Sequence, residues 1–415
     1  MGKNTWLIKT FLKARWKEKW KMLKGFLFGE KKYLEIPDGE PHVDMKELVR
    51  CALCPNMCKF ECPSLRVTKK EMYAPSTKSR ISFFMEKGYL DSSNPHTAEV
   101  PYLCTNCDGC RHWCPMGIST GDLLKDVRAD LVERGHVSST LKEFNKRVQK
   151  EKTTFNRDTF KKPGFSVNTP GADTFYYMGC VMAEKKPDAV KANIVILKKA
   201  GVLFSTHVRY RVCCGGPLFT AGFRDTAKSL AKENLDLFEK AGISTVVADC
   251  PACTDAIRTK YKELGLDHDL EVYNTTEYYA NLIKEGRLVP TKPVNMIIAF
   301  HDPCIIARGF DDTESARYIF SKIPGLEVRE PFLHGKETQC CGMGGVSHVH
   351  HPHESEAIGM QRYMQLKDTG ADYLVSACPA CEEGFSIAGT NAEMEDDRRK
   401  LVILDIGEIL VSSLE

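Results

Sequence analysis

Eighteen cysteines in 415 residues constrain this chain more than any other feature of its sequence. Cysteine at this density indicates a disulfide scaffold, structural zinc sites or iron–sulfur chemistry. Disulfide scaffolds are typically small secreted domains with poor cores, whereas this chain can bury a large core and its sequence begins with no apolar export signal. Metal ligation is therefore the leading interpretation before any spacing is considered.

Eight cysteines form two runs in the N-terminal part of the chain. The second run is Cys104-x2-Cys107-x2-Cys110-x3-Cys114-Pro115, the bacterial ferredoxin spacing, in which the fourth cysteine reaches the other [4Fe–4S] cubane. The first run is Cys51-x2-Cys54-x3-Cys58-x3-Cys62-Pro63. The crossing rule predicts one set made of Cys51, Cys54, Cys58 and Cys114, and another made of Cys62, Cys104, Cys107 and Cys110. Two structural zinc sites are the alternative, since zinc also takes four thiolates.

The remaining ten cysteines form one pattern twice. The first copy is Cys180-x32-Cys213-Cys214-x35-Cys250-x2-Cys253, and the second is Cys304-x35-Cys340-Cys341-x36-Cys378-x2-Cys381. Glycines follow each adjacent pair, as they do where a backbone approaches a metal–sulfide cluster and donates N–H groups to its sulfur atoms. Five thiolates exceed what one zinc ion or one simple cubane needs.

Hydrophobic patterns repeat together with these cysteines. An apolar, β-rich segment ends at Cys180 and another at Cys304, while residues 242–253 match residues 370–381 from glycine through strand to Cys-Pro-Ala-Cys. Strand–helix alternation predicts two related α/β domains behind a helical, ferredoxin-like module. The expected domains are an N-terminal arm (1–35), a two-cubane module (36–150), a linker (151–171) and two Cys-Cys-Gly domains (172–290 and 291–415).

The arm differs from the rest of the chain in charge. Residues 1–33 hold ten Lys or Arg against two acids, so they carry +8 of a net charge that is +3 overall. They also hold Trp6, Trp16 and Trp20, on a pattern that predicts a basic amphipathic helix. Such a helix suits an anionic membrane surface or a membrane partner. The alternative is a helix that packs on its own protein. The balanced overall charge gives no reason to expect nucleic acid as a partner.

The doubled Cys-Cys-Gly pattern behind a two-cubane module resembles the heterodisulfide reductase catalytic subunits of methanogens and their relatives. The resemblance covers residues from about 45 to the end. It implies two cubane and two non-cubane [4Fe–4S] clusters, a coenzyme M–coenzyme B disulfide as substrate, and an integral-membrane cytochrome b partner. It also implies a cytoplasmic protein attached peripherally to the inner face of the cell membrane. One position departs from the family, because Ile305 stands where a histidine often follows the first cysteine of the second repeat.

Reducing a disulfide needs protons, so titratable groups near the clusters are candidates. His301 lies three residues before Cys304, and a run from His348 to His353 follows the second adjacent pair. The predicted catalytic residues are His301, His348, Cys213, Cys214, Cys340 and Cys341. His301 could instead orient its loop, and the run could be a solvated helix entry.

Arginines near the repeats suit the anionic groups of a heterodisulfide. Arg209 and Arg211 precede Cys213, and Arg308 follows Cys304. Ordinary surface arginines are the alternative.

The sequence therefore predicts an iron–sulfur oxidoreductase that acts on a sulfur group. Three other hypotheses stay open. The chain could be a quinone-linked relative that acts on another disulfide or thiol, an electron-conduit subunit of a membrane complex, or a zinc scaffold. The sequence does not set the direction of electron flow, because cluster potentials depend on their surroundings.

Overall fold

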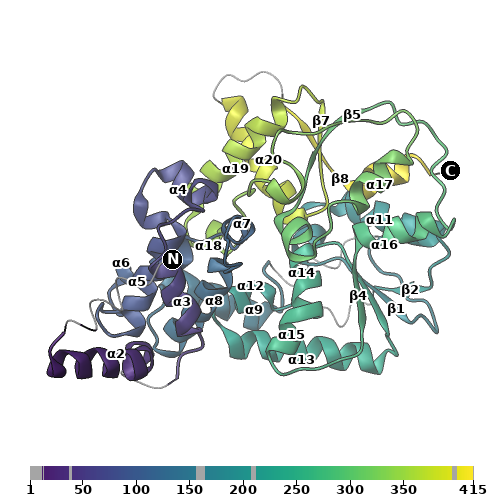
Figure 1. Cartoon of the computed structure of the whole chain (residues 1–415). Coiled ribbons are helices and arrows are strands. Elements are labelled where there is room, and N and C mark those ends of the chain that lie inside the picture. The colour runs from purple at the N-terminus through teal and green to yellow at the C-terminus, as the bar shows by residue number, and fades with distance from the viewer. Residues whose placement is uncertain are drawn as a thin grey trace.

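Two parallel four-stranded sheets organise the C-terminal part of the molecule (Figure 1). The computed structural model describes residues 12, 14–36, 40–155, 164–206, 212–394 and 400–414. The first sheet has the order β2-β1-β3-β4 and the second has the order β6-β5-β7-β8. Their strands are β1 (Thr174–Tyr177), β2 (Phe204–Ser205), β3 (Thr245–Ala248), β4 (Glu271–Asn274), β5 (Ile297–His301), β6 (Glu327–Arg329), β7 (Tyr373–Ser376) and β8 (Val402–Asp405).

The strand registers confirm the prediction of two related α/β domains. Tyr177 pairs with Ala248 in the first sheet, and His301 pairs with Ser376 in the second. Ala248 and Ser376 are each the last residue of their strand, and each lies two residues before a Cys-Pro-Ala-Cys segment. Tyr177 and His301 are therefore equivalent positions of the two repeats.

Helices connect the strands of each repeat. The first repeat holds α10 (Cys180–Lys185), α11 (Pro187–Lys199), α12 (Gly216–Ala221), α13 (Arg224–Lys240), α14 (Pro251–Asp255), the π-helix η6 (Ala256–Lys260), α15 (Tyr261–Glu263) and α16 (Thr275–Lys284). The second holds the π-helix η7 (Ile305–Gly309), α17 (Ser315–Ser321), η8 (Gly335–Glu337), α18 (Ser347–His350), α19 (Pro352–Lys367), α20 (Pro379–Met394) and α21 (Ile406–Ser412). Packing of α11 on α21, α10 on α20 and α16 on α17 joins the repeats.

Short helices make up the ferredoxin-like region, as predicted. They are α3 (Met45–Ala52), η1 (Lys59–Glu61), α4 (Pro63–Thr68), η2 (Glu71–Tyr73), α5 (Pro75–Glu86), α6 (Pro95–Ala98), η3 (Val100–Leu103), α7 (Gly109–His112), α8 (Thr120–Glu133) and α9 (Ser139–Glu151). In Figure 1 this region lies beside the sheets, with α18 and α19 of the second repeat against it.

Arg128, on α8, ties the ferredoxin-like region to both repeats. Its guanidinium is fully buried and donates to the carbonyl oxygens of Thr220 in the first repeat and Gly345 in the second, at 3.0 and 3.2 Å. It also donates to the carbonyl oxygens of Pro101 and Cys104, each at 2.8 Å. One buried cation thus satisfies carbonyl groups of all three parts of the molecule, each of which would be costly to leave unpaired.

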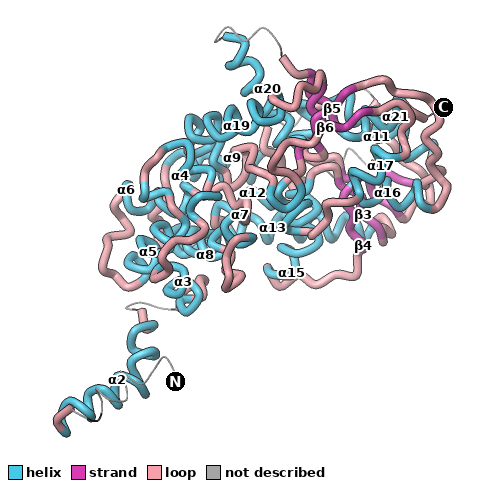
Figure 2. The backbone as a smooth tube through the Cα atoms, turned by 45° about the horizontal axis from the view of Figure 1, so that its top comes forward, coloured by secondary structure: helices cyan, strands magenta, loops and turns pink. Residues whose placement is uncertain are grey.

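The described part of the arm is α2 (Trp16–Leu34), which stands clear of the body in Figure 2. Trp16 and Trp20 are 80% and 53% exposed. Residues 1–11 and 13 of the predicted arm lie outside the described residues. Among the helices that the structure describes, none is both long and apolar enough to cross a membrane.

Candidate metal centres

All 18 cysteines lie within the described residues, and none of them is joined in a disulfide. They form four groups. Two are the crossed sets predicted from the N-terminal runs, and the other two are the five cysteines of each repeat. Thiols brought together without bonding to one another are the donor set that iron–sulfur clusters require. The chemistry of the donors therefore fits iron–sulfur clusters better than a disulfide scaffold.

The outer cysteine set consists of Cys51, Cys54, Cys58 and Cys114. Burial, followed by the thiolates of Cys51, Cys114 and Cys54, raises the pKa of Cys58 to about 12. Ser79 Oγ donates to Cys51 Sγ at 3.2 Å, and Thr120 Oγ1 lies 3.4 Å from the same sulfur. The structure thus brings the fourth cysteine of the second run to three cysteines of the first run, as the crossing rule predicts.

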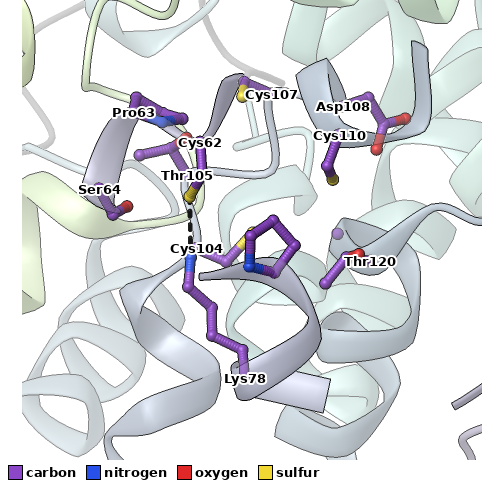
Figure 3. Close-up of a pocket in the computed structure, with 12 residues that line it drawn as sticks. Cys62, Pro63, Ser64, Lys78, Cys104, Thr105, Cys107, Asp108, Cys110 and Thr120 are labelled. Carbon is purple, nitrogen blue, oxygen red and sulfur yellow. Dashed lines mark hydrogen bonds between the residues drawn. The ribbon is translucent and has the colours of Figure 1, made fainter. Parts of the chain in front are cut away.

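The inner cysteine set consists of Cys62, Cys104, Cys107 and Cys110. Figure 3 shows these side chains around one pocket, with Lys78 reaching in from α5. Cys62 precedes Pro63, the first residue of α4. Proline disfavours helical backbone in the residue before it and is tolerated at a helix start, so the Cys-Pro pair places the thiol at the helix N-terminus. The positive end of the helix favours a thiolate there.

Cysteines of the first repeat contact one another in a continuous series. Hydrogen bonds from Cys213 and Cys253 lower the pKa of Cys214 to about 6. A hydrogen bond with Cys213 and then burial raise the pKa of Cys180. Cys250 is linked to Cys253, and this bond lowers its pKa. The five cysteines that the sequence pattern groups therefore lie together, all of them buried.

The second repeat adds a histidine to the same arrangement. Hydrogen bonds from Cys340 and Cys381 lower the pKa of Cys341 well below its usual range, and His301 contributes a further bond. One ligand atom each from His301, Cys341 and Cys381 lies within 4.8 Å of the others, and all three residues are buried. The side chain of Cys378 forms a hydrogen bond with that of Cys381, and Cys304 lies close enough to Cys341 to feel its charge.

The hydrogen bonds of His301 define its tautomer. Arg362 Nε donates to Nδ1 of His301 at 3.3 Å, and a guanidinium has no acceptor atom. Nδ1 is therefore the acceptor, and the ring proton sits on Nε2. The remaining bond of the ring, to Cys341, is then an Nε2–H donation to sulfur. Burial, and to a lesser degree the charge of Arg362, lowers the pKa of His301, which keeps the ring neutral.

The other sequence-predicted candidates lie in varied surroundings. His348 is exposed and contacts the carbonyl oxygen of Met343 through Nδ1 at 3.1 Å. His350 packs edge-on against Tyr102, with ring centroids 5.3 Å apart. Arg308 is close to the cysteines, since its Nε donates to the Cys107 carbonyl oxygen at 2.8 Å. Arg209 and Arg211 lie outside the described residues.

Two contacts connect the sets to one another. A hydrogen bond joins Cys107 of the inner set to Cys340 of the second repeat, and another joins Cys378 of the second repeat to Cys250 of the first. Ligand spacing within a set does not indicate such contacts between sets. The four sets therefore lie in the order outer, inner, second repeat, first repeat.

Sequence reasoning missed Lys78, Ser79, Thr120 and Arg362. The first two lie on α5, whose buried face is largely polar and includes Ser76, Ser79 and Ser82. Hydroxyl groups three residues apart share one side of a helix. That spacing, in the segment between the two cysteine runs, is the signal that could have indicated a helix facing sulfur.

Family models match all three parts of the chain. A 4Fe-4S dicluster domain matches residues 47–118, and a cysteine-rich domain matches residues 174–258 and again residues 298–386. The crystal structure of a hypothetical protein from Helicobacter pylori superposes with a TM-score of 0.53 over 94% of this chain and 75% of that one. At 14% identity, this similarity shows the fold alone.

Curated relatives match most of this chain. One subunit of the dihydromethanophenazine:CoB–CoM heterodisulfide reductase of Methanosarcina barkeri is 28% identical, over 90% of this chain and 95% of that protein. One subunit of the fumarate reductase (CoM/CoB) of Methanothermobacter marburgensis is 26% identical, over 86% of this chain and 71% of its own length. The EtfAB:quinone oxidoreductase of Syntrophomonas wolfei is 26% identical, over 77% of this chain and 47% of that protein. With a 4Fe–4S dicluster domain before two cysteine-rich domains, the chain therefore belongs to the heterodisulfide reductase-like family of iron–sulfur oxidoreductases.

Proposed function

We propose that the chain is the catalytic subunit of a heterodisulfide reductase that acts on the coenzyme M–coenzyme B disulfide. The reaction breaks one S–S bond, consumes two electrons and two protons, and yields two thiols. Two of the curated relatives carry CoB–CoM or CoM/CoB in their names. Both repeats of this chain keep all five cysteines, which a subunit that only conducts electrons would not need.

The four cysteine sets indicate which residues would hold each cluster. The outer and inner sets would each hold a cubane [4Fe–4S] cluster, and the five cysteines of each repeat would hold a non-cubane one. When bound, the clusters supply the one-electron steps that a two-electron disulfide reduction requires. The protein contributes the thiolate ligands, the helix ends that favour them, and the hydrogen bonds to sulfur.

The order of the sets is the observation that supports this function best. The Cys107–Cys340 and Cys250–Cys378 contacts make one continuous series from the ferredoxin-like region to the boundary between the repeats. Electrons that enter at the half-exposed outer set would reach the second repeat before the first. The disulfide would bind where the two Cys-Pro-Ala-Cys segments meet.

His301 is the residue that we assign to proton positioning. Its Nε2–H faces Cys341, and Arg362 holds the ring from the other side. The ring can therefore hold a proton beside sulfur, while the buried guanidinium fixes its orientation. His348, on α18, is the second candidate for a proton donor.

Activity on the substrate tests the function directly. Anaerobically purified protein with reduced methyl viologen should reduce the coenzyme M–coenzyme B disulfide and release two thiols per disulfide. Glutathione disulfide serves as the matched control substrate. Release of no thiol from the heterodisulfide would reject the substrate, and equal rates with both disulfides would reject its specificity.

The electron donor in this proposal is an integral-membrane cytochrome b, met on the cytoplasmic face of the membrane. The exposed tryptophans of α2 and the +8 charge of residues 1–33 suit that surface. Deleting residues 1–33 should release the protein from membranes, and raising salt should mimic part of the loss. Reduction by methyl viologen should persist, because no cysteine is removed. Equal loss with both donors would show that the arm is part of the fold.

A quinone-linked electron conduit is the second candidate. It is favoured by the match to the EtfAB:quinone oxidoreductase. Under this alternative, the centres would be reduced by quinol in the presence of the membrane partner, and no disulfide would be consumed. The thiol-release assay separates the two.

A further inference from the structure

One helix, α5, serves the outer and inner cysteine sets with different chemistry. Lys78 Nζ lies 3.7 Å from Cys62 Sγ of the inner set. Figure 3 marks this contact with a dashed line. The next residue, Ser79, donates its hydroxyl to Cys51 Sγ of the outer set at 3.2 Å. Consecutive helical residues point about 100° apart, so a single helix can lie between two sites and face both. The inner set receives a cation, and the outer set receives a neutral donor.

Lys78 is buried, and none of the carboxylates in the described part of the chain pairs with it. Its side chain is 2% exposed, and its ammonium donates to the Leu103 carbonyl oxygen at 2.9 Å. Among the described residues, no carboxylate lies within ion-pair distance of it. Burial acts to lower the pKa of Lys78, but the four thiolates of the inner set outweigh this and raise it. A buried charge needs a counter-charge, and the inner set is the group that supplies it.

Two further cations lie beside the inner set. Arg308 donates to the Cys107 carbonyl oxygen. Burial acts to lower the pKa of Arg308, but the thiolates of Cys107, Cys304 and Cys340 outweigh it and raise the pKa. Arg128, fully buried, donates to the Cys104 carbonyl oxygen. All three positive charges would act on a cluster held there.

The outer set lacks a comparable cation among the residues that the structure describes. Burial raises the pKa of Cys51, and the charges that act on it most strongly belong to Cys54 and Cys114. Arg80 donates to the Ala52 carbonyl oxygen nearby at 3.0 Å, but its side chain is exposed, so water and salt screen its charge.

We propose that Lys78 makes the centre held by the inner cysteine set easier to reduce than the one held by the outer set, and so directs electrons inward. Adding an electron adds negative charge, and a fixed cation in a dry site stabilises the reduced form. Water reaches the outer set more easily and would otherwise favour its reduction, so the buried lysine reverses the expected order. The inference rests on the two-cubane part of the proposed function and on none of its disulfide chemistry.

A redox titration of the holoprotein followed by electron paramagnetic resonance tests this inference. Lys78→Met keeps the length of the side chain and removes its charge. It should move the midpoint potential of one cubane signal to a more negative value and leave the other in place. Ser79→Ala should shift the other signal, by less, because a hydroxyl donor is lost instead of a charge. Arg80→Met, the matched control two positions along the helix, should shift neither signal.

Unchanged potentials in Lys78→Met, or equal shifts of both cubane signals, would overturn the proposal. If this variant loses iron, Arg308→Met tests the same charge effect with a second cation that lies beside the inner set. It should shift the same signal in the same direction, and no shift would reject the inference. No disulfide enters the titration, so a protein that shows these shifts and reduces no disulfide would keep the inference and lose the proposed function.

Discussion

The two cysteine-rich repeats share one fold and one cysteine pattern, yet they differ in what surrounds the adjacent cysteine pair. The second repeat has His301 at the end of β5, where it donates to Cys341. The first repeat has Tyr177 at the equivalent position, and its hydroxyl donates to the Val212 carbonyl oxygen. Only the second of these repeats offers a hydrogen to a thiolate from this position. Duplication has therefore kept the ligands and changed the groups that tune them.

Both repeats contact the ferredoxin-like region, but they differ in how closely they approach its inner cysteine set. After Cys341 the chain continues Gly342-Met343-Gly344-Gly345, and a Cβ on Gly345 would collide with the Cys104 carbonyl oxygen. The first repeat makes its close approach elsewhere, since a Cβ on Gly222 would collide with the backbone of Arg128 on α8, and its adjacent pair is followed by Gly215 and Gly216 alone. The extra glycines let the second repeat press against the inner set. We therefore expect electrons to enter the repeats through the second one, which contacts the inner set.

Removing one cysteine ligand from each repeat in turn should reveal the largest difference between the repeats. Cys341→Ser should abolish disulfide reduction, lower iron by about four atoms per chain and leave the cubanes reducible. It should also leave the first repeat unreduced, because electrons would arrive through the second. Cys214→Ser should cost the same iron but keep the second repeat reducible. Spectroscopic titration of both variants measures this, and identical behaviour would contradict the order of the sets.

The close approach of Gly345 to the Cys104 backbone predicts a smaller difference between the repeats, in the free energy of unfolding. Gly345→Ala places a methyl group against backbone at a φ of +64°, so we expect it to lower the free energy of unfolding by about 2–4 kcal/mol. Gly216→Ala, within α12 of the first repeat, should change it by less than about 1 kcal/mol, since its added Cβ lies 3.2 Å from the closest atom. Chemical denaturation under anaerobic conditions compares the two. Equal effects would mean that the second repeat is not pressed against the inner set.

The equivalent positions at the strand ends should show the smallest difference. His301→Phe removes the donor to Cys341 and should lower disulfide reduction by about 10- to 100-fold, as loss of a group that supports a metal ligand typically does. Tyr177→Phe removes a bond to a carbonyl oxygen and should change the rate far less. Iron content should stay unchanged in both variants. If Tyr177→Phe proved as damaging as His301→Phe, the chemical asymmetry of the repeats would be wrong.

Sequence reasoning predicted the grouping of cysteines because ligands of one set follow short, fixed spacings, as in Cys104, Cys107 and Cys110. It predicted two related α/β domains because the strand, the glycine and the Cys-Pro-Ala-Cys segment repeat together. It could not predict the Cys107–Cys340 contact, because spacing carries no information about how separate regions pack. It missed Lys78 because a lysine in a polar segment is typical of a surface, and only tertiary packing buries it.

The central claim is that the 18 cysteines hold four clusters, two in the ferredoxin-like region and one in each repeat. The most direct measurement is the iron, sulfide and zinc content of protein purified without oxygen. We expect about 16 iron atoms per chain, with matching sulfide and no zinc. About eight iron atoms would restrict clusters to the ferredoxin-like region, and zinc in place of iron would reject the redox function altogether.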